Sequence, residues 1–405
     1  MVEKGLLIEM SEPSFRFFDC DTHYYEATDA FTRHIEPAFR KRAMQWGQID
    51  GKTRLLVGGT INRFIPNPTF DPVAKPGVLD EYFRGRNPKK ASTTELFGEL
   101  EPIRPEYRDR DARLKLMDEQ GMEGSILLPT LGVGMEHSLA QDIPAMTAAF
   151  RAFNRWLLDD WGFAYRDRIF GAPYITLSDP ENAVRELEWA LDNDARFVVM
   201  IPGPVVTIDG YRAPADPMFD GFWRLLNDTG ITLCYHGGET AYAQFLQTWG
   251  QQNFASQSFN FAGFRSVFSA EPVQDTFANH LVNGLFHRFP NLRMASIELG
   301  SAWVFHLFEK LTKSYGQTPH LFPEDPRETF RRHVWVSPYY EDELASLLKL
   351  VGAERIIMGS DYPHVEGLAD PGSYIKDLEN FDFTPDECRT VMRDNGLALS
   401  IRRTV

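Results

Sequence analysis

The strongest chemical signal in the sequence is a pair of metal-ligand residue types near the N-terminus. Asp21 and His23 stand two positions apart, at the end of an apolar run that predicts a strand over residues 15–21. Successive side chains of a strand point to opposite faces, so residues at i and i+2 share one face. A carboxylate and an imidazole on one face at a strand end can form half of a metal site.

Three more apolar runs later in the chain end in residues of the same kind. Two predicted strands end at His236 and Glu298, and another is followed by Asp361. Singly, each could have a structural role, such as packing at a strand end or starting a turn. Glu298 is the hardest to explain in this way, because a carboxylate in a buried strand is costly unless it is paired or bound to a metal. Together these side chains predict a metal centre.

Imidazole and carboxylate groups are good ligands for Zn²⁺, Mn²⁺ and Fe²⁺. Such an ion lowers the pKa of a bound water towards ~7, and a nearby base can then take up its proton. We expect Glu298 or Asp361 to be this base, with His364 close by in the loop that follows Asp361. Glu366 in the same loop either supports these groups or faces substrate.

Polar and aromatic residues just beyond the predicted strand ends are candidates for binding a substrate. A role in packing or in a surface turn is the alternative for each of them. The candidates are Tyr24, Glu26, Arg265 and Tyr339.

The elements that must position these residues alternate regularly from about residue 109 onward. Continuous apolar runs are typical of strands that are covered on both faces. Eight of them, each followed by a helix, favour an α/β fold that closes into a (β/α)₈ TIM barrel. No GxGxxG follows a strand, which argues against a dinucleotide-binding sheet. The predicted strands cover residues 15–21, 125–129, 169–174, 197–201, 231–236, 292–298, 334–337 and 355–359.

In such a barrel, functional residues lie at the C-terminal ends of the strands. The candidate metal ligands should therefore meet at one end of the barrel. Their distance from one another along the chain is no obstacle, because each follows a different strand.

Residues 40–106 interrupt the regular pattern after the first strand. They are rich in Pro, Gly, Asn and Lys, which predicts an irregular insertion that acts as a lid, a dimer arm or both. A short helix is expected over residues 29–39, and extra helices close the chain after the eighth strand. We predict a single domain over residues 1–405 with this insertion.

The composition limits the class of protein. The net charge of −15 argues against nucleic-acid binding, which requires a basic surface. No run approaches the ~18 apolar residues of a membrane span. Cys20, Cys234 and Cys388 cannot form a disulfide framework, which favours a reducing compartment. Cys20 and Cys234 lie in apolar runs, as small buried hydrophobic residues do. We expect a cytoplasmic protein whose partner is a small-molecule substrate.

Three motifs resemble the amidohydrolase superfamily. They are the Asp21-x-His23 pair, residues 289–293 (Phe-Pro-Asn-Leu-Arg) and residues 359–364 (Gly-Ser-Asp-Tyr-Pro-His). The most similar branch is the amidohydrolase-related group that includes aminocarboxymuconate semialdehyde and resorcylate decarboxylases. The resemblance covers residues from about 15 to 400, except the insertion.

The resemblance implies a distorted (β/α)₈ barrel that holds a divalent ion through Asp21, His23, His236 and Asp361. It also implies hydrolysis of C–N or C–O bonds, or non-oxidative decarboxylation, and a homodimer or larger assembly. Glu298 departs from the pattern, because decarboxylases of this branch have a His at that position.

The sequence thus predicts a metal-dependent hydrolase that acts on a small organic acid, amide or ester through activated water. Zn²⁺ is the expected ion, with Mn²⁺ or Fe²⁺ as alternatives and one or two ions bound. A metal-dependent decarboxylase is the second hypothesis. A dinuclear Fe/Mn oxygenase is the third, because Glu298 makes the site rich in carboxylates. A fourth is a non-catalytic barrel that supports an active paralogous subunit.

Overall fold

The parallel strands of the protein form two sheets. The computed structural model describes residues 13–403, with the exception of 66, 243–244, 246–247 and 251–271. The first sheet has the order β1-β5-β6 and the second the order β12-β11-β10-β7. Their bounds are β1 (Phe17–Tyr24), β5 (Met122–Pro129), β6 (Ile169–Gly171), β7 (Phe197–Met200), β10 (Thr232–His236), β11 (Arg293–Ile297) and β12 (Val334–Val336).

Shorter contacts join the two sheets into a ring. On one side, Tyr174 bridges in parallel to Val199 of β7. On the other side, residues 356–362 take the place of an eighth strand between β12 and β1. Ile356 bridges to Val336, and Tyr362 bridges to Thr22, both in parallel. The ring is a distorted (β/α)₈ barrel, as predicted.

The eighth strand differs from its prediction, because residues 355–359 are not a regular strand. The backbone nonetheless bonds to both neighbours: the Ile357 N–H donates to the Val336 carbonyl at 3.0 Å, and the Cys20 N–H donates to the Met358 carbonyl at 2.9 Å. These single bonds keep the ring closed without a continuous ladder.

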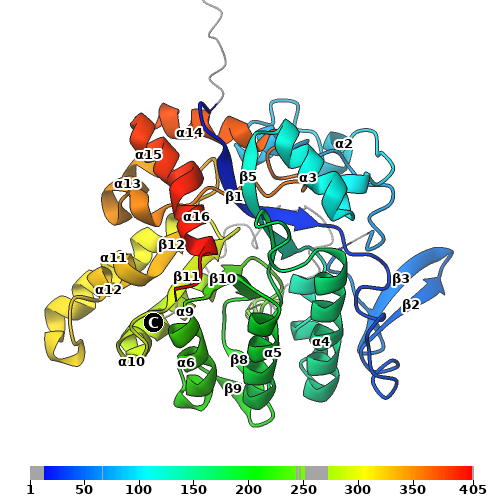
Figure 1. Cartoon of the computed structure of the whole chain (residues 1–405), viewed down its shortest axis with the longest axis horizontal. Coiled ribbons are helices and arrows are strands. Elements are labelled where there is room, and N and C mark those ends of the chain that lie inside the picture. Colours follow the sequence, from blue (N-terminus) through cyan, green and yellow to red (C-terminus); the bar gives the residue numbers. More distant parts are fainter. Residues whose placement is uncertain (1–12, 66, 243–244, 246–247, 251–271, 404–405) are drawn as a thin grey trace, which may run out of the picture.

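Helices cover the outside of the ring, and Figure 1 shows α4, α5 and α6 side by side along one edge of the molecule. The Asp179 carboxylate accepts a hydrogen bond from the Asn182 N–H at the start of α5, as expected for an N-cap. Gly230, with φ of 61°, ends α6. The helices are α3 (Arg110–Glu119), α4 (Ile143–Asp160), α5 (Pro180–Asp192), α6 (Asp220–Thr229), α9 (Pro272–Val282), α10 (Leu285–Arg288), α11 (Ala302–Gln317), α12 (Pro326–His333), α13 (Leu344–Val351), α14 (Tyr374–Asn380), α15 (Pro385–Arg389) and α16 (Asn395–Ser400).

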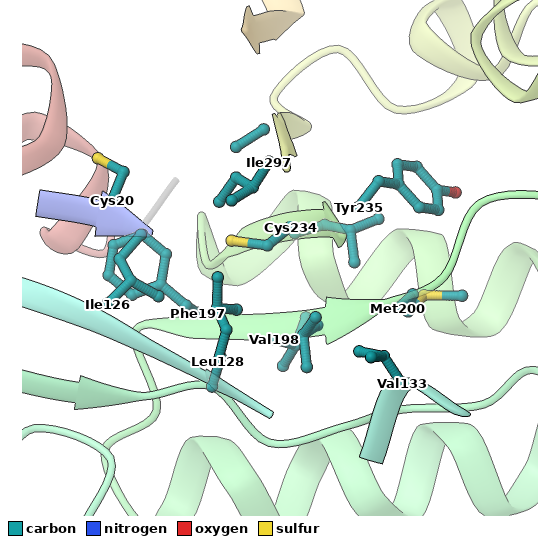
Figure 2. Packing of buried hydrophobic residues seen from close by; sticks show 14 of the residues in the cluster. Cys20, Ile126, Leu128, Val133, Phe197, Val198, Met200, Cys234, Tyr235 and Ile297 are labelled. Carbon is teal, nitrogen blue, oxygen red and sulfur yellow. The ribbon is translucent and has the colours of Figure 1, made fainter. Parts of the chain in front are cut away.

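The buried side chains of strands and helices form one large hydrophobic cluster. Cys20 and Cys234 belong to it, and Figure 2 shows both among the packed side chains of the barrel strands. All three cysteines are buried and free, which confirms the prediction that Cys20 and Cys234 pack as small hydrophobic residues. Among the described residues, no helix is both long and apolar enough to cross a membrane.

The insertion is more regular than the sequence suggested. Its first part is an antiparallel sheet with the order β2-β3-β4, followed by two short helices. Figure 1 shows β2 and β3 extending at one side of the molecule. Residues 29–39, by contrast, form turns instead of the expected helix. The bounds are β2 (Met44–Ile49), β3 (Lys52–Val57), β4 (Thr60–Ile61), α1 (Asp80–Phe83) and α2 (Thr93–Leu96), and a separate hairpin pairs β8 (Val205–Thr207) with β9 (Gly210–Arg212).

The second half of the insertion is tied to the loop after the eighth barrel segment. The Gly77 N–H donates to the His364 carbonyl at 3.1 Å, and the Leu79 N–H donates to the Val365 carbonyl at 2.8 Å. Gly77 has φ of 70°, and a Cβ there would lie 2.7 Å from the Ala369 nitrogen. Only glycine allows this close contact between the two loops.

Arg84, just after α1, fixes the insertion to the C-terminal part of the chain. Its guanidinium donates to both Asp377 oxygens at 2.8 and 3.0 Å and to Asp80 at 2.6 Å. It also lies 4.3 Å from the centroid of the Tyr340 ring. The Arg84 and Asp377 side chains are only 16% and 12% exposed, so removal of one leaves the other poorly solvated and unpaired.

Replacing Arg84 with alanine is expected to lower the free energy of unfolding by about 2 kcal/mol, because Asp377 loses its partner in a shielded site. Arg86→Ala is the matched control. Its partner is Glu81, and both side chains are 63% exposed, so we expect about 0.5 kcal/mol or less. Urea denaturation of both variants measures the difference. Equal losses would show that the Arg84 contacts do not stabilise the fold.

Candidate metal centre

Asp21 and His23 meet on one face of β1, as their spacing predicts. Asp21 Oδ1 lies 3.2 Å from His23 Nε2, and both side chains are buried. His236, at the end of β10, has its Nδ1 2.8 Å from the Gly237 carbonyl oxygen. This contact fits an Nδ1–H donor and directs Nε2 toward Asp21 Oδ1, which lies 3.6 Å away. The histidine is therefore oriented as a metal ligand would be.

The two remaining carboxylates are Glu298, which directly follows β11, and Asp361, which lies in the eighth barrel segment. Glu298 Oε2 lies 2.9 Å from His236 Nε2 and 3.7 Å from His23 Nε2. Asp361 Oδ1 lies 3.3 Å from His23 Nε2. The side chains that were predicted to meet do meet, at the C-terminal end of the barrel. In two overlapping groups, the ligand atoms lie within 4.8 Å of one another: Asp21, His23, His236 and Glu298, then His23, Glu298, Asp361 and His364.

Glu298 and Asp361 share an unusual backbone conformation. Their φ angles are 52° and 58°, in the left-handed region. For a residue with a side chain this conformation costs roughly 1–2 kcal/mol. Such strain is concentrated at functional sites, where the surrounding structure enforces it. Here both strained residues carry carboxylates of the cluster.

Glycines at two strand ends let the backbone segments come close enough. A Cβ on Gly359 would lie 2.6 Å from the Asp21 Cβ and 2.6 Å from Ser337 Oγ. A Cβ on Gly237 would lie 2.7 Å from the Glu298 carbonyl oxygen. Any larger residue at either position would push a carboxylate of the cluster out of place.

Asp19 positions the backbone that carries the cluster, and it was not among the site residues predicted from the sequence. Its Oδ1 accepts hydrogen bonds from the Asp21 N–H at 3.1 Å and from the Ser360 N–H at 3.0 Å. Burial raises the pKa of Asp19 to about 7. The signal was present in the sequence, since Asp19, Asp21 and His23 alternate along one strand.

His364 joins the cluster through a short contact. Its Nδ1 lies 2.5 Å from Asp361 Oδ1, and its ring stacks on the His23 ring with centroids 4.0 Å apart. On the other side, its Nε2 lies 3.0 Å from Thr130 Oγ1. Nothing in the amino-acid pattern singles out Thr130, which fixes the orientation of this imidazole.

Crowding of charge perturbs the acids and bases of the cluster. Burial, together with the charge of Glu298, raises the pKa of Asp361 well above its ordinary value. Burial lowers the pKa of His23 to about 4, and the neighbouring His364 adds to this effect. Burial also opposes a charge on His236, but the Glu298 carboxylate raises its pKa above the ordinary value.

The facing atoms of the cluster are buried and have no hydrogen bond. Buried polar atoms normally have a partner, so this group of unpaired donors and acceptors requires an explanation. A divalent cation satisfies lone pairs of carboxylates and neutral imidazoles together. The residues present therefore fit such an ion. The atoms are Asp21 Oδ1, His23 Nε2, His236 Nε2, Asp361 Oδ1 and His364 Nδ1.

The predictions for substrate-binding residues need correction. Tyr24 is fully buried against Trp156 and Trp161, with centroids 5.5 and 5.7 Å away. Glu26 is also buried, and its Oε1 accepts hydrogen bonds from the N–H groups of Leu131 and Gly132. Neither residue lines the cavity at the cluster, because Tyr24 follows His23 directly and therefore points to the opposite face of β1. Glu26 instead holds the loop after β5.

Tyr339 does line the cavity, as predicted, and its hydroxyl donates to the Glu298 carbonyl at 3.1 Å. Arg265, the remaining candidate, lies outside the described residues. Tyr25 and Tyr340 also line the cavity.

Comparison with known proteins agrees with this geometry. Residues 18–399 match the model of the amidohydrolase family. The chain belongs to the amidohydrolase family. It is accordingly a metal-dependent enzyme on a TIM barrel, which argues against the non-catalytic subunit of the fourth hypothesis.

An amidohydrolase of known structure from Mycobacterium avium subspecies paratuberculosis K-10 is 39% identical in sequence to this chain. It covers 96% of this chain and 99% of its own, with a TM-score of 0.89. A dihydroxybenzoic acid decarboxylase from Polaromonas species JS666, solved with manganese and 2-nitroresorcinol, is 18% identical. It covers 80% of this chain and 93% of its own, with a TM-score of 0.57, and so shares the fold.

A curated relative from Dictyostelium discoideum is named 2-amino-3-carboxymuconate-6-semialdehyde decarboxylase. It is 29% identical over 113 residues. The match spans 26% of this chain and only 31% of that relative's length.

Replacing Tyr24 with phenylalanine is expected to leave metal affinity and cavity binding unchanged. The Tyr24 hydroxyl is buried and has no hydrogen-bond partner, so its removal should keep or raise the free energy of unfolding, by up to about 1 kcal/mol. Metal titration and urea denaturation measure both quantities. A loss of metal or ligand affinity would restore Tyr24 as a residue of the site.

Replacing Glu298 with glutamine is expected to weaken metal binding by about 10- to 100-fold, because an anionic ligand is lost while the shape is kept. Competition with a chelator measures the affinity. Glu341→Gln is the matched control, since Glu341 lines the same cavity but does not belong to the cluster. If Glu298→Gln binds metal as the unmodified protein does, Glu298 is not a ligand.

Proposed function

We propose that the protein is a metal-dependent hydrolase that cleaves an ester or amide by adding water to its carbonyl carbon. The observation that carries this proposal is the composition of the site. Carboxylates of the cluster line the cavity, and the most exposed of them, Glu298, is 24% exposed. A carboxylate is a suitable general base for a water molecule.

Asp21, His23, His236 and Asp361 are the residues we propose to hold the ion, with Glu298 as a further ligand that also acts as the base. A bound divalent ion would polarise the substrate carbonyl and lower the pKa of a water towards ~7. Nitrogen and oxygen ligands of this kind suit Zn²⁺, which we retain as the proposed ion. The manganese in the Polaromonas decarboxylase structure makes Mn²⁺ the first alternative, with Fe²⁺ and a second ion after it.

Glu298 is the proposed base. Its side chain is 24% exposed, compared with 4% for Asp21 and 12% for Asp361, so it is the most open of these carboxylates to the cavity. Its Oε2 would accept the proton of the attacking water. His364 would donate a proton to the leaving group. Asp361, whose Oδ1 lies 2.5 Å from His364 Nδ1, would orient this imidazole.

The insertion is proposed to act as a lid. Its residues line the same cavity as the cluster, and the Arg84 contacts hold it against the C-terminal part of the chain. By keeping bulk water away, such a cover strengthens the electrostatic interactions inside. Several features stay predictions. They are a role of the insertion as a dimer arm, a homodimer or larger assembly, a paralogous subunit, and a cytoplasmic location.

Non-oxidative decarboxylation is the second candidate. The curated relative from Dictyostelium and the Polaromonas structure are both named decarboxylases. In that reaction the substrate carboxylate leaves as CO₂, and a site residue places a proton on the carbon that carried it. Glu298 and His364 would be the residues able to supply the proton. The dinuclear Fe/Mn oxygenase is third and requires two ions per chain.

A substrate panel with metal-loaded protein separates these reactions. We expect hydrolysis of aryl esters or anilides, with one ¹⁸O from labelled water in the acid product, because water attacks the carbonyl. Removal of the ion with a chelator should abolish turnover, and Zn²⁺ or Mn²⁺ should restore it. The ion content per chain is measured in parallel.

Release of CO₂ from aromatic acids, without hydrolysis of any ester or amide, would favour the decarboxylase. Consumption of O₂ with two Fe or Mn ions per chain would favour the oxygenase. Turnover that survives complete metal removal would contradict every one of these mechanisms.

A further inference from the structure

The cavity next to the cluster is larger and more apolar than a small organic acid needs. Its volume is about 660 Å³, in the range of pockets that enclose drug-sized ligands. The cluster forms one end, while the insertion supplies much of the remaining wall. The insertion side chains on this wall are mostly aromatic or aliphatic, among them Phe64, Ile65, Phe70, Phe83, Phe97 and Leu100.

Stacked rings lead from the cluster into this apolar region. His23 stacks on His364 with centroids 4.0 Å apart, and His364 lies 5.9 Å from the Tyr25 ring. Tyr25 in turn stacks on Phe70 of the insertion at 4.5 Å, with 19° between the ring planes. A flat apolar ligand can lie along such a wall while its polar end reaches the cluster.

Acidic side chains line the cavity without a lysine or arginine among the described residues beside them. Asp21, Glu298, Glu341, Asp361 and Glu366 all line the cavity. Among the lining residues that the structure describes, no lysine or arginine is present. Among the described lining residues, an anionic group away from the cluster would lie near carboxylic acids and find no lysine or arginine to pair with, which is costly.

We propose that the substrate is an uncharged acyl compound with an apolar body of two or more rings. The rings lie against Tyr25 and Phe70, and the carbonyl group reaches the metal-ligand cluster. This inference rests on the proposed hydrolysis and narrows its substrate from a small acid, amide or ester to a bulky neutral ester, lactone or amide.

The reaction on such a substrate is balanced by water alone. The water oxygen bonds to the carbonyl carbon, and the bond from that carbon to the alcohol oxygen or amine nitrogen breaks. Glu298 takes one proton from water, and the leaving group receives one from His364, whose ring Asp361 orients. After the products leave, the proton on Glu298 passes to His364 and restores both groups. The products are a carboxylic acid and an alcohol or amine. The new acid has no cation among the described lining residues to hold it, which favours its release.

Binding of unreactive ketones tests the substrate class independently of turnover. We expect 2-acetonaphthone to bind metal-loaded protein about 10-fold more tightly than acetophenone, because the second ring is buried against apolar side chains. The ketone 1-(6-nitronaphthalen-2-yl)ethanone should bind about 10-fold more tightly than 6-acetyl-2-naphthoate, because its nitro group has the shape of a carboxylate without the charge that meets the acidic wall. Calorimetry measures the four affinities.

Leu100 offers a test of the charge argument by substitution. It lines the cavity and is 48% exposed, so a polar side chain there is compatible with the fold. Leu100→Arg should raise the affinity for 6-acetyl-2-naphthoate at least about 10-fold, whereas Leu100→Gln should not. Circular dichroism and metal content confirm that both variants are folded.

The outcomes separate this inference from the proposed function. If the ketones follow the expected order but no ester or amide is hydrolysed, the substrate shape holds and the hydrolase is wrong. If phenyl acetate is hydrolysed faster than 2-naphthyl acetate and the ketone order is reversed, the hydrolase holds and the bulky substrate is wrong. Tighter binding of the free carboxylate in unmodified protein would also overturn the inference.

Discussion

The contact between β1 and residues 356–362 holds the metal centre together. The His23 N–H donates to the Tyr362 carbonyl at 2.7 Å, and the Asp361 N–H donates to the Asp21 carbonyl at 2.8 Å. Asp19 adds a carboxylate that accepts from both segments. Because the barrel closes here, ligands from the two ends of the chain share one site. Gly359 permits the approach, since a Cβ at that position would collide with Asp21.

This arrangement places buried acids beside a large apolar space. The fold has to keep carboxylates close together, and the cost is lowered by a cation and by the imidazoles between them. Because acidic side chains line the cavity and no lysine or arginine is among its described lining residues, we expect an anionic group of a ligand to bind poorly in the apolar part. The cluster therefore favours the carbonyl group of the proposed substrate. The stacked rings from His364 to Phe70 favour its hydrophobic body.

Much of the metal centre could be predicted from the sequence because parallel strands have simple geometry. Alternation places Asp21 and His23 on one face, and barrel strands bring their C-terminal ends together. The same rule would have excluded Tyr24, which follows His23 and packs against Trp156 and Trp161. Asp19 was missed although it obeys that rule. Thr130 directly follows β5, but a threonine is not a typical metal ligand, and only the packing at the barrel end places it against His364.

The amino-acid pattern was enough to predict the chemical types of the ligands, the strands that carry them and the end of the barrel where they meet. These features depend on local apolar patterns and on alternation within single strands. The folded structure was needed to show how close the ligands come, which backbone conformation Glu298 and Asp361 adopt, and which residues of the insertion line the cavity. Those properties depend on packing between distant segments, because a turn at a strand end or a lid over a barrel is fixed by its neighbours in space.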